Sequence, residues 1–140
     1  MDISVNLTAV LVAAVAMFVV GAIWYMPLFG NLWGKIHGFD KYDKKTQDEM
    51  RKGMMPYLVV QFLLGLTTAY VLAHVIGAFP ENNAYELAVW MWLGFVVPIQ
   101  IGAVIFGGTE PKWMVKKSLV MAGGSLATLL VAAWVIVALG

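Results

Sequence analysis

Four stretches of the chain are apolar over about the 20 residues that a helix needs to cross a hydrocarbon core. None of them alternates between apolar and polar positions, as a membrane β-strand does, so helices remain as the spanning structures. Short connections make consecutive helices antiparallel neighbours. The pattern predicts an all-α integral membrane protein with a single domain, an antiparallel bundle of four transmembrane helices. The expected spans are residues 5–26, 54–77, 84–106 and 115–139.

Composition supports a membrane protein. The 140 residues are 61% hydrophobic and 12% charged, whereas a soluble domain is about half apolar and about a quarter charged. The chain opens with Met1-Asp2 instead of a basic region, and its first apolar run is longer than a signal-peptide core. We therefore expect the first span to be retained. The absence of cysteine excludes disulfides and thiol chemistry.

Basic residues are confined to two of the connections between spans. All nine Lys and Arg lie either in residues 28–53 or in residues 112–117, and the connection between the second and third spans has none. Because basic residues mark the cytoplasmic side of a membrane protein, we expect residues 28–53 in the cytoplasm and both termini outside it.

The first connection, residues 28–53, is longer than a turn requires. Thr46 and Glu49 have the spacing of a capping box and Gly53 is suited to a helix end, so a short cytoplasmic surface helix is predicted here. Six basic and four acidic residues leave a small positive surplus. The sequence therefore favours a solvated connector with incidental lipid contact over an arm held on anionic lipid.

Aromatic residues mark the point where the first span leaves the membrane. Trp24, Tyr25 and Trp33 are predicted interface anchors, because Trp and Tyr prefer the level of the lipid headgroups. Pro27 and Gly30 lie between them and favour a turn that folds Trp33 back towards the bilayer.

The two shorter connections carry helix-capping signals. Asn83 precedes Glu86 by three residues and is expected to cap the third span. Before the fourth span, Gly107 is expected to end one helix, Thr109 to cap the next and Pro111 to stand in its first turn.

Small residues recur every four positions on two of the spans and are predicted to let helices pack closely. Packing within one bundle and a homo-oligomer seam both fit this pattern. The residues are Gly65, Ala69, Ala73 and Gly77 on the second span and Gly124, Thr128 and Ala132 on the fourth.

A group of polar residues is predicted inside the membrane. Gln61 and Gln100 lie at similar depth, with Gln61 about 10 Å from the cytoplasmic end of its span at about 1.5 Å per residue. Pro98 cannot donate to the carbonyl of Gly94, and residues 123–125 of the fourth span fall in the same layer. We interpret Gln61, Pro98 and Gln100 as an intramembrane polar layer, either two glutamines hydrogen-bonded to each other or part of a cavity.

The sequence contains no motif of a catalytic, cofactor-binding or metal-binding site. Its two histidines, His37 and His74, lie in different parts of the chain and form no paired-histidine pattern. We therefore expect neither an enzyme nor a cofactor, and we expect no nucleic-acid partner.

Three segments resemble a known family. They are Ile3-Ser-Val-Asn6-Leu, Gly21-x-x-Trp24-Tyr25-x-Pro27-Leu-Phe29-Gly30-x-x-Trp33 and Trp92-x-Gly94-Phe95. The chain resembles, over almost its whole length, the bacterial membrane family catalogued as domain of unknown function 1761. The resemblance implies a small protein of four helices in the bacterial inner membrane, and it brings no established activity and no catalytic residues.

These features favour a non-enzymatic membrane protein that self-associates and binds membrane lipid or a membrane partner. The alternative is a carrier or channel for a small neutral or weakly polar solute, through the layer of Gln61, Pro98 and Gln100. No charged residue lies deep in a predicted span, which argues against proton- or ion-coupled transport.

Overall fold

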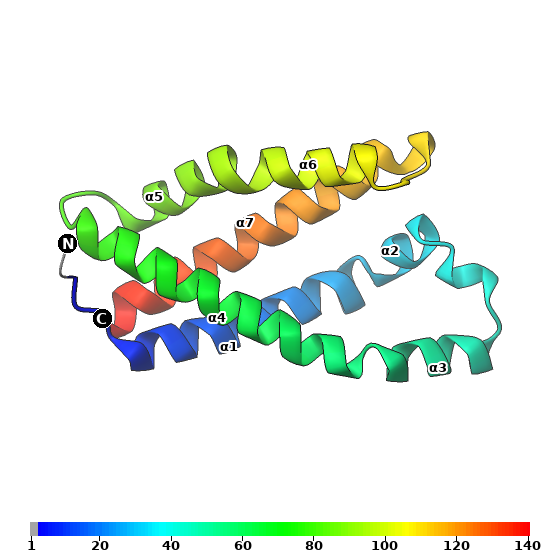
Figure 1. Cartoon of the computed structure of the whole chain (residues 1–140), viewed down its shortest axis with the longest axis horizontal. Coiled ribbons are helices and arrows are strands. Elements are labelled where there is room, and N and C mark those ends of the chain that lie inside the picture. Colours follow the sequence, from blue (N-terminus) through cyan, green and yellow to red (C-terminus); the bar gives the residue numbers. More distant parts are fainter. Residues whose placement is uncertain (1–2) are drawn as a thin grey trace.

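The computed structural model describes residues 3–140, and within that range it consists of helices joined by short turns (Figure 1). Met1 and Asp2, on which the expectation of a retained first span partly rests, lie outside the described residues. In chain order the elements are α1 (Leu7–Ile23), the π-helix η1 (Trp24–Leu28), α2 (Gly30–Ile36), the 3-10 helix η2 (Phe39–Lys41), α3 (Lys44–Gly53), α4 (Met55–Ala78), α5 (Ala84–Met91), the π-helix η3 (Trp92–Val96), α6 (Val97–Phe106), the 3-10 helix η4 (Pro111–Trp113) and α7 (Met114–Leu139).

Four continuous helical segments are long and apolar enough to cross a membrane, as the hydrophobic pattern predicts. The first starts two residues later than expected because Asn6 caps it: its side-chain oxygen accepts hydrogen bonds from the amides of Thr8 and Ala9. The fourth starts earlier than expected, at Pro111, because η4 runs directly into α7. The segments are Leu7–Leu28, Met55–Ala78, Ala84–Phe106 and Pro111–Leu139.

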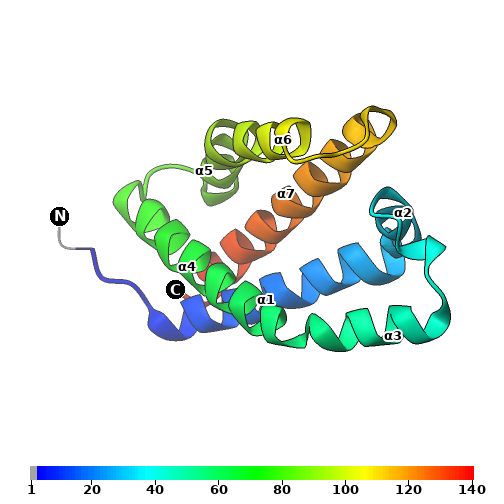
Figure 2. The ribbon, with the colours of Figure 1, turned by 45° about the vertical axis from the view of Figure 1, so that its right-hand side comes forward.

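Helix α7 lies at the centre of the arrangement. It packs along α1 on one side and along α5 and α6 on another, while α4 packs mainly on α1 (Figures 1 and 2). The start of α1 meets the end of α7, where the Asn6 side chain donates a hydrogen bond to the carbonyl of Leu139. We call this the terminal end; α2, α3 and the turn between α6 and α7 lie at the opposite end, the lysine-rich end (Figure 1).

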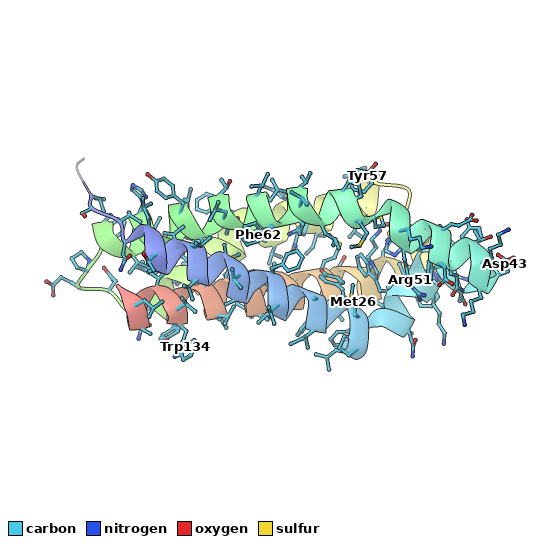
Figure 3. All side chains as sticks on the ribbon, turned by 90° about the horizontal axis from the view of Figure 1, so that it is seen from below. Met26, Asp43, Arg51, Tyr57, Phe62 and Trp134 are labelled. Atoms are coloured by element: carbon cyan, nitrogen blue, oxygen red, sulfur yellow. The ribbon has the colours of Figure 1, made fainter. Side chains whose placement is uncertain are left out.

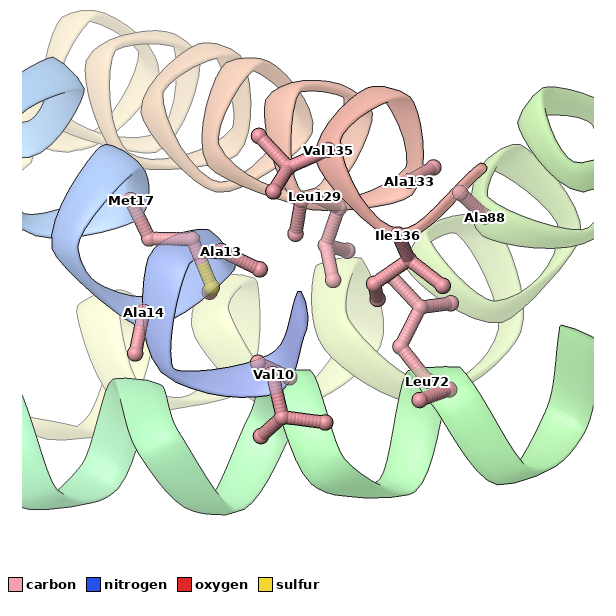
Figure 4. Packing of buried hydrophobic residues seen from close by; sticks show 13 residues of the cluster. Val10, Ala13, Ala14, Met17, Leu72, Ala88, Leu129, Ala133, Val135 and Ile136 are labelled. Carbon is pink, nitrogen blue, oxygen red and sulfur yellow. The ribbon is translucent and has the colours of Figure 1, made fainter. Parts of the chain in front are cut away.

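The buried core lies in the half of the molecule nearer the terminal end. Alanine is its commonest residue, and Ala13, Ala69 and Ala132 are completely buried. Such small side chains let helix backbones approach closely, and in lipid this close packing is a main source of helix association. Figure 4 shows the larger members, Leu72 of α4 and Ile136 of α7, pointing into the space between these helices.

Two of the four spans contain a π-helix next to a proline. Pro27 lies inside η1, and Pro98 stands in the first turn of α6, directly after η3. A proline ring clashes with the preceding turn of a regular α-helix and cannot donate to it, and the wider π turn accommodates such an interruption. At Pro98, which was expected to leave the Gly94 carbonyl without its usual donor, the helix is therefore irregular, with the π-helix η3 directly before the proline.

The first connection folds as α2, η2 and α3, so the predicted surface helix is present as α3. Its predicted cap was wrong: α3 begins at Lys44, and Asp43 caps it by accepting a hydrogen bond from the amide of Thr46 at 3.0 Å. Hydrogen bonds from the side chain and then the backbone of Thr46 hold the pKa of Asp43 below its ordinary value. Gly53 is the last residue of α3, as expected.

At the terminal end, Asn83 caps α5 as predicted, by accepting hydrogen bonds from the amides of Tyr85 and Glu86.

At the lysine-rich end, the predicted cap by Thr109 is wrong. Glu110 occupies the N-cap position of η4, and the Thr109 hydroxyl is buried with no hydrogen-bond partner among the described residues.

Candidate functional site

Trp24 joins the first span to the fourth. Its indole Nε1 donates a hydrogen bond of 2.9 Å to the carbonyl of Val120 on α7. The ring lies so close to α7 that a Cβ atom at Gly123 would come within 2.7 Å of it, and one at Gly124 within 3.0 Å. A side chain at Gly123 would force the ring to shift, and one at Gly124 would crowd it, so Trp24 packs inside the protein rather than lying only among lipids.

Trp92 makes the corresponding contact from the third span. Its indole Nε1 lies 2.9 Å from the carbonyl of Ala122 and 3.0 Å from the hydroxyl of Ser125, both on α7. The Ser125 oxygen lies 3.0 Å from Gln100 Oε1 and also 3.0 Å from the Ala122 carbonyl, and its single proton serves one of them at a time. Each π-helix thus begins with a tryptophan whose indole binds the backbone of α7.

The predicted polar layer is only partly assembled. Gln100 binds Ser125, but Gln61 of α4 has an exposed side chain and no hydrogen bond joins it to Gln100 among residues 3–140. The structure therefore corrects the expected glutamine pair, because α4 packs on α1 and not on α6. Pro98 is exposed and contributes through the shape of the backbone. The sequence had placed Ser125 at this depth without identifying it as the partner.

Most residues of the small-residue strips pack within the chain. Ala69, Ala73 and Ala132 belong to the buried core, and Gly124 holds the Trp24 ring. Gly65 is different, because a Cβ atom there would meet nothing within 4 Å. A Cβ atom at Gly77 would come within 2.8 Å of the Ile3 side chain, and the Thr128 hydroxyl donates to the Ser125 carbonyl.

Aromatic rings form a connected row at the lysine-rich end. The Tyr25 and Trp33 rings meet edge to face with centroids 4.8 Å apart, and the His37 ring lies 4.4 Å from Trp33. The turn at Pro27 and Gly30 therefore folds Trp33 back onto the span, as predicted. The Lys117 ammonium of α7 lies 5.8 Å from the centroid of Trp33, so this row also meets the fourth span.

A pocket of about 700 Å³ opens between the first and third connections. We call it the basic pocket. One wall comes from the end of α2, the turn after it and η2, and the other from the turn before η4, η4 itself and the start of α7. Its charged and histidine lining residues are Lys35, His37, Asp40, Lys41, Glu110, Lys112 and Lys117, and its other lining residues are Ile36, Gly38, Tyr42, Gly107, Gly108, Thr109 and Trp113.

The basic pocket was not predicted from the sequence, although its signal was visible as the two groups of lysines on one side of the membrane. What the sequence could not show is that the first and third connections fold against each other. No group of three or more His, Cys, Asp or Glu side chains suited to hold a metal ion occurs among residues 3–140.

The fold and this distribution of residues define a multi-pass membrane protein whose basic side chains gather at one end, beside a row of aromatic rings. The chain belongs to the family described as "Protein of unknown function (DUF1761)", whose sequence model matches residues 8–137. This confirms the resemblance seen in the sequence. No curated protein and no solved structure matches the chain.

Proposed function

We propose that this protein is a non-enzymatic component of the bacterial inner membrane that binds anionic phospholipid at its lysine-rich end. In this proposal the lysine-rich end faces the cytoplasm and both termini face outward. The observation that carries the proposal is that all nine Lys and Arg of the chain lie at this end, against five acidic residues there. Figure 3 shows the labelled Asp43 and Arg51 of the first connection at this end, far from Trp134.

The aromatic residues beside these lysines support a position at the level of lipid headgroups. Trp33 lies beneath the Lys117 ammonium, and the ammonium groups of Lys112 and Lys116 lie 5.6 and 5.5 Å from the centroid of Trp113. Tryptophan prefers the membrane interface, and a basic group near an anionic leaflet gains about 1 kcal/mol. The first connection is therefore better explained as a lipid-binding segment than as a solvated connector.

Neither of the other readings gains support. Self-association was inferred from the small-residue strips, and most of those residues pack inside the chain. Solute transport was inferred from a shared layer of Gln61 and Gln100, but Gln100 binds Ser125 instead and Gln61 lies apart from it. Lipid binding is the function that the basic residues and the neighbouring tryptophans of the lysine-rich end support.

Native mass spectrometry of the purified protein with equal amounts of phosphatidylglycerol and phosphatidylcholine tests the proposal. We expect phosphatidylglycerol to be retained preferentially, and we expect the preference to fall as salt is added, because exposed charges are screened by salt. Equal retention of the two lipids at low salt would contradict the proposal.

A further inference from the structure

We propose that the basic pocket is a binding site for one phosphate group, carried either by an anionic phospholipid headgroup or by free inorganic phosphate. The inference deepens the proposed function and rests on it for the lipid source, but the pocket itself is a separate structural claim. General attraction to an anionic surface needs only exposed lysines. A pocket binds its ligand at one place and with a defined set of donors.

The pocket brings together residues that are far apart in the sequence. Lys35 and Lys41 come from α2 and η2, and Lys117 comes from α7. The turns on both sides carry a glycine in the left-handed conformation, Gly38 with φ of 72° and Gly108 with φ of 79°. A residue with a Cβ atom is strained in this conformation, so these two glycines shape the walls.

The charges of the pocket leave positive groups free for an anion. Glu110 pairs with Lys112, their nitrogen and oxygen lying 3.5 Å apart. Lys35, Lys41 and Lys117 form no ion pair among the described residues, and Asp40 is the remaining acidic residue of the lining. Three ammonium groups without a carboxylate partner, of which that of Lys117 lies over the Trp33 ring, against one unpaired carboxylate favour an anionic ligand.

A buried hydroxyl provides an independent observation. Thr109 lines the pocket, and its Oγ1 is buried without a hydrogen-bond partner among residues 3–140. A buried hydroxyl without a partner is costly, and a native structure needs a reason for each one. The oxygen is closed off from the pocket in this structure, so we infer that a rotation of the Thr109 side chain about χ1 turns the hydroxyl towards a bound phosphate, whose strong acceptor oxygens then accept from it and from the lysines.

The size of the pocket agrees with such a ligand. A volume of about 700 Å³ lies within the range of about 300–1,000 Å³ that holds small organic ligands. It is large enough for a phosphate together with the glycerol part of a headgroup. Trp113 and Tyr42 in the lining offer apolar surface beside the charged groups.

The test compares two double variants of the full-length protein that remove the same charge. Lys35→Gln/Lys41→Gln changes two exposed lysines of the pocket, and Lys44→Gln/Lys45→Gln changes two exposed lysines of α3 outside it. Binding of phosphatidylglycerol is titrated by native mass spectrometry. We expect the pocket variant to lose at least about tenfold more affinity than the control variant, because the pocket lysines bind the phosphate through charge-assisted hydrogen bonds, whereas the α3 lysines act only through screened attraction.

Thr109→Val tests the site without changing its charge. It keeps the shape of the side chain and removes the hydroxyl, so the first bound phosphatidylglycerol should bind several-fold more weakly while the binding of further molecules stays unchanged. The same titration of wild-type protein in phosphatidylcholine nanodiscs with inorganic phosphate distinguishes the two sources. Saturable binding of inorganic phosphate that Lys35→Gln/Lys41→Gln abolishes would assign the site to free phosphate.

The possible failures are distinguishable. Equal losses in the pocket and control variants, with Thr109→Val unchanged, would overturn the pocket and leave general binding of anionic lipid in place. If wild-type protein shows no preference for phosphatidylglycerol, the proposed function fails. In that case the pocket stands only if inorganic phosphate binds and Lys35→Gln/Lys41→Gln abolishes that binding, and it is overturned if phosphate does not bind.

Discussion

The indole of Trp24 donates a hydrogen bond to the carbonyl of Val120, 96 positions later in the chain. This contact fixes the end of the first span against the fourth, at the point where the π-helix η1 begins. On the other side of the same stretch of α7, Trp92 binds Ala122 and Ser125. The helices that hold the lysine-rich end are thus joined by two tryptophans, not by apolar packing alone.

Replacement of Trp24 should destabilise the protein. Trp24→Ala removes a ring packed against two glycines of α7, and such a loss costs about 3 kcal/mol or more. Thermal unfolding in detergent measures the effect. Trp134→Ala is the matched control, because Trp134 is 60% exposed and should contribute little. Equal melting temperatures of wild-type protein and Trp24→Ala would contradict the role of this ring.

The fit of the Trp24 ring also predicts the effect of enlarging its neighbour. Gly123→Ala should lower the melting temperature, because its Cβ would come within 2.7 Å of the ring. Gly102→Ala in α6 should be neutral or stabilising, since nothing lies within 4 Å of its Cβ position and alanine favours a helix by about 1 kcal/mol. A Gly123→Ala protein as stable as Gly102→Ala would show that the ring can move aside freely.

The effects of replacing Gln100 and Ser125 on the stability of the protein should be coupled, whereas replacing Gln61 should not destabilise it. Gln100→Leu and Ser125→Ala should each cost about 0.5–2 kcal/mol, the range of interhelical hydrogen bonds in membranes, and the double variant should lose less than the sum. Gln61→Leu should leave stability unchanged or raise it, because its exposed side chain makes no hydrogen bond among the described residues. Strict additivity of Gln100→Leu and Ser125→Ala would argue against their contact.

The spans could be predicted from the sequence because lipid imposes a length and an apolar composition on every crossing segment. The contact of Trp33 with Tyr25 could also be predicted, because Pro27 and Gly30 lie between them and favour a turn. The partner of Gln100 could not be predicted, because matching depth does not determine which helices are neighbours. Placing α4 against α1 separates Gln61 from Gln100 and leaves Ser125 as the partner.

The cap of α3 shows a second limit of the sequence. Thr46 and Glu49 match a capping box, yet Asp43 three residues earlier offers a better acceptor, and the helix begins there. The basic pocket shows a third limit. Its two walls come from connections that are more than sixty residues apart, and only the packing of α1 on α7 brings them together.

The proposed orientation predicts which residues can be reached from outside the cell. A cysteine introduced at Asn82, in the turn between α4 and α5, should react with a membrane-impermeant thiol reagent in intact cells. A cysteine introduced at Lys44, in the first connection, should react only after the cells are opened. The chain has no cysteine of its own, so no background labelling arises. The reverse pattern would place the lysine-rich end outside and contradict the orientation.

The melting temperature of the full-length protein in lipid nanodiscs tests most directly whether the lysine-rich end binds anionic lipid. Nanodiscs of phosphatidylcholine are compared with nanodiscs that also contain phosphatidylglycerol, at low and at high salt. A ligand that binds only the folded state stabilises it, so phosphatidylglycerol should raise the melting temperature at low salt, and salt should diminish the gain. The same melting temperature in both lipids at low salt would contradict the account.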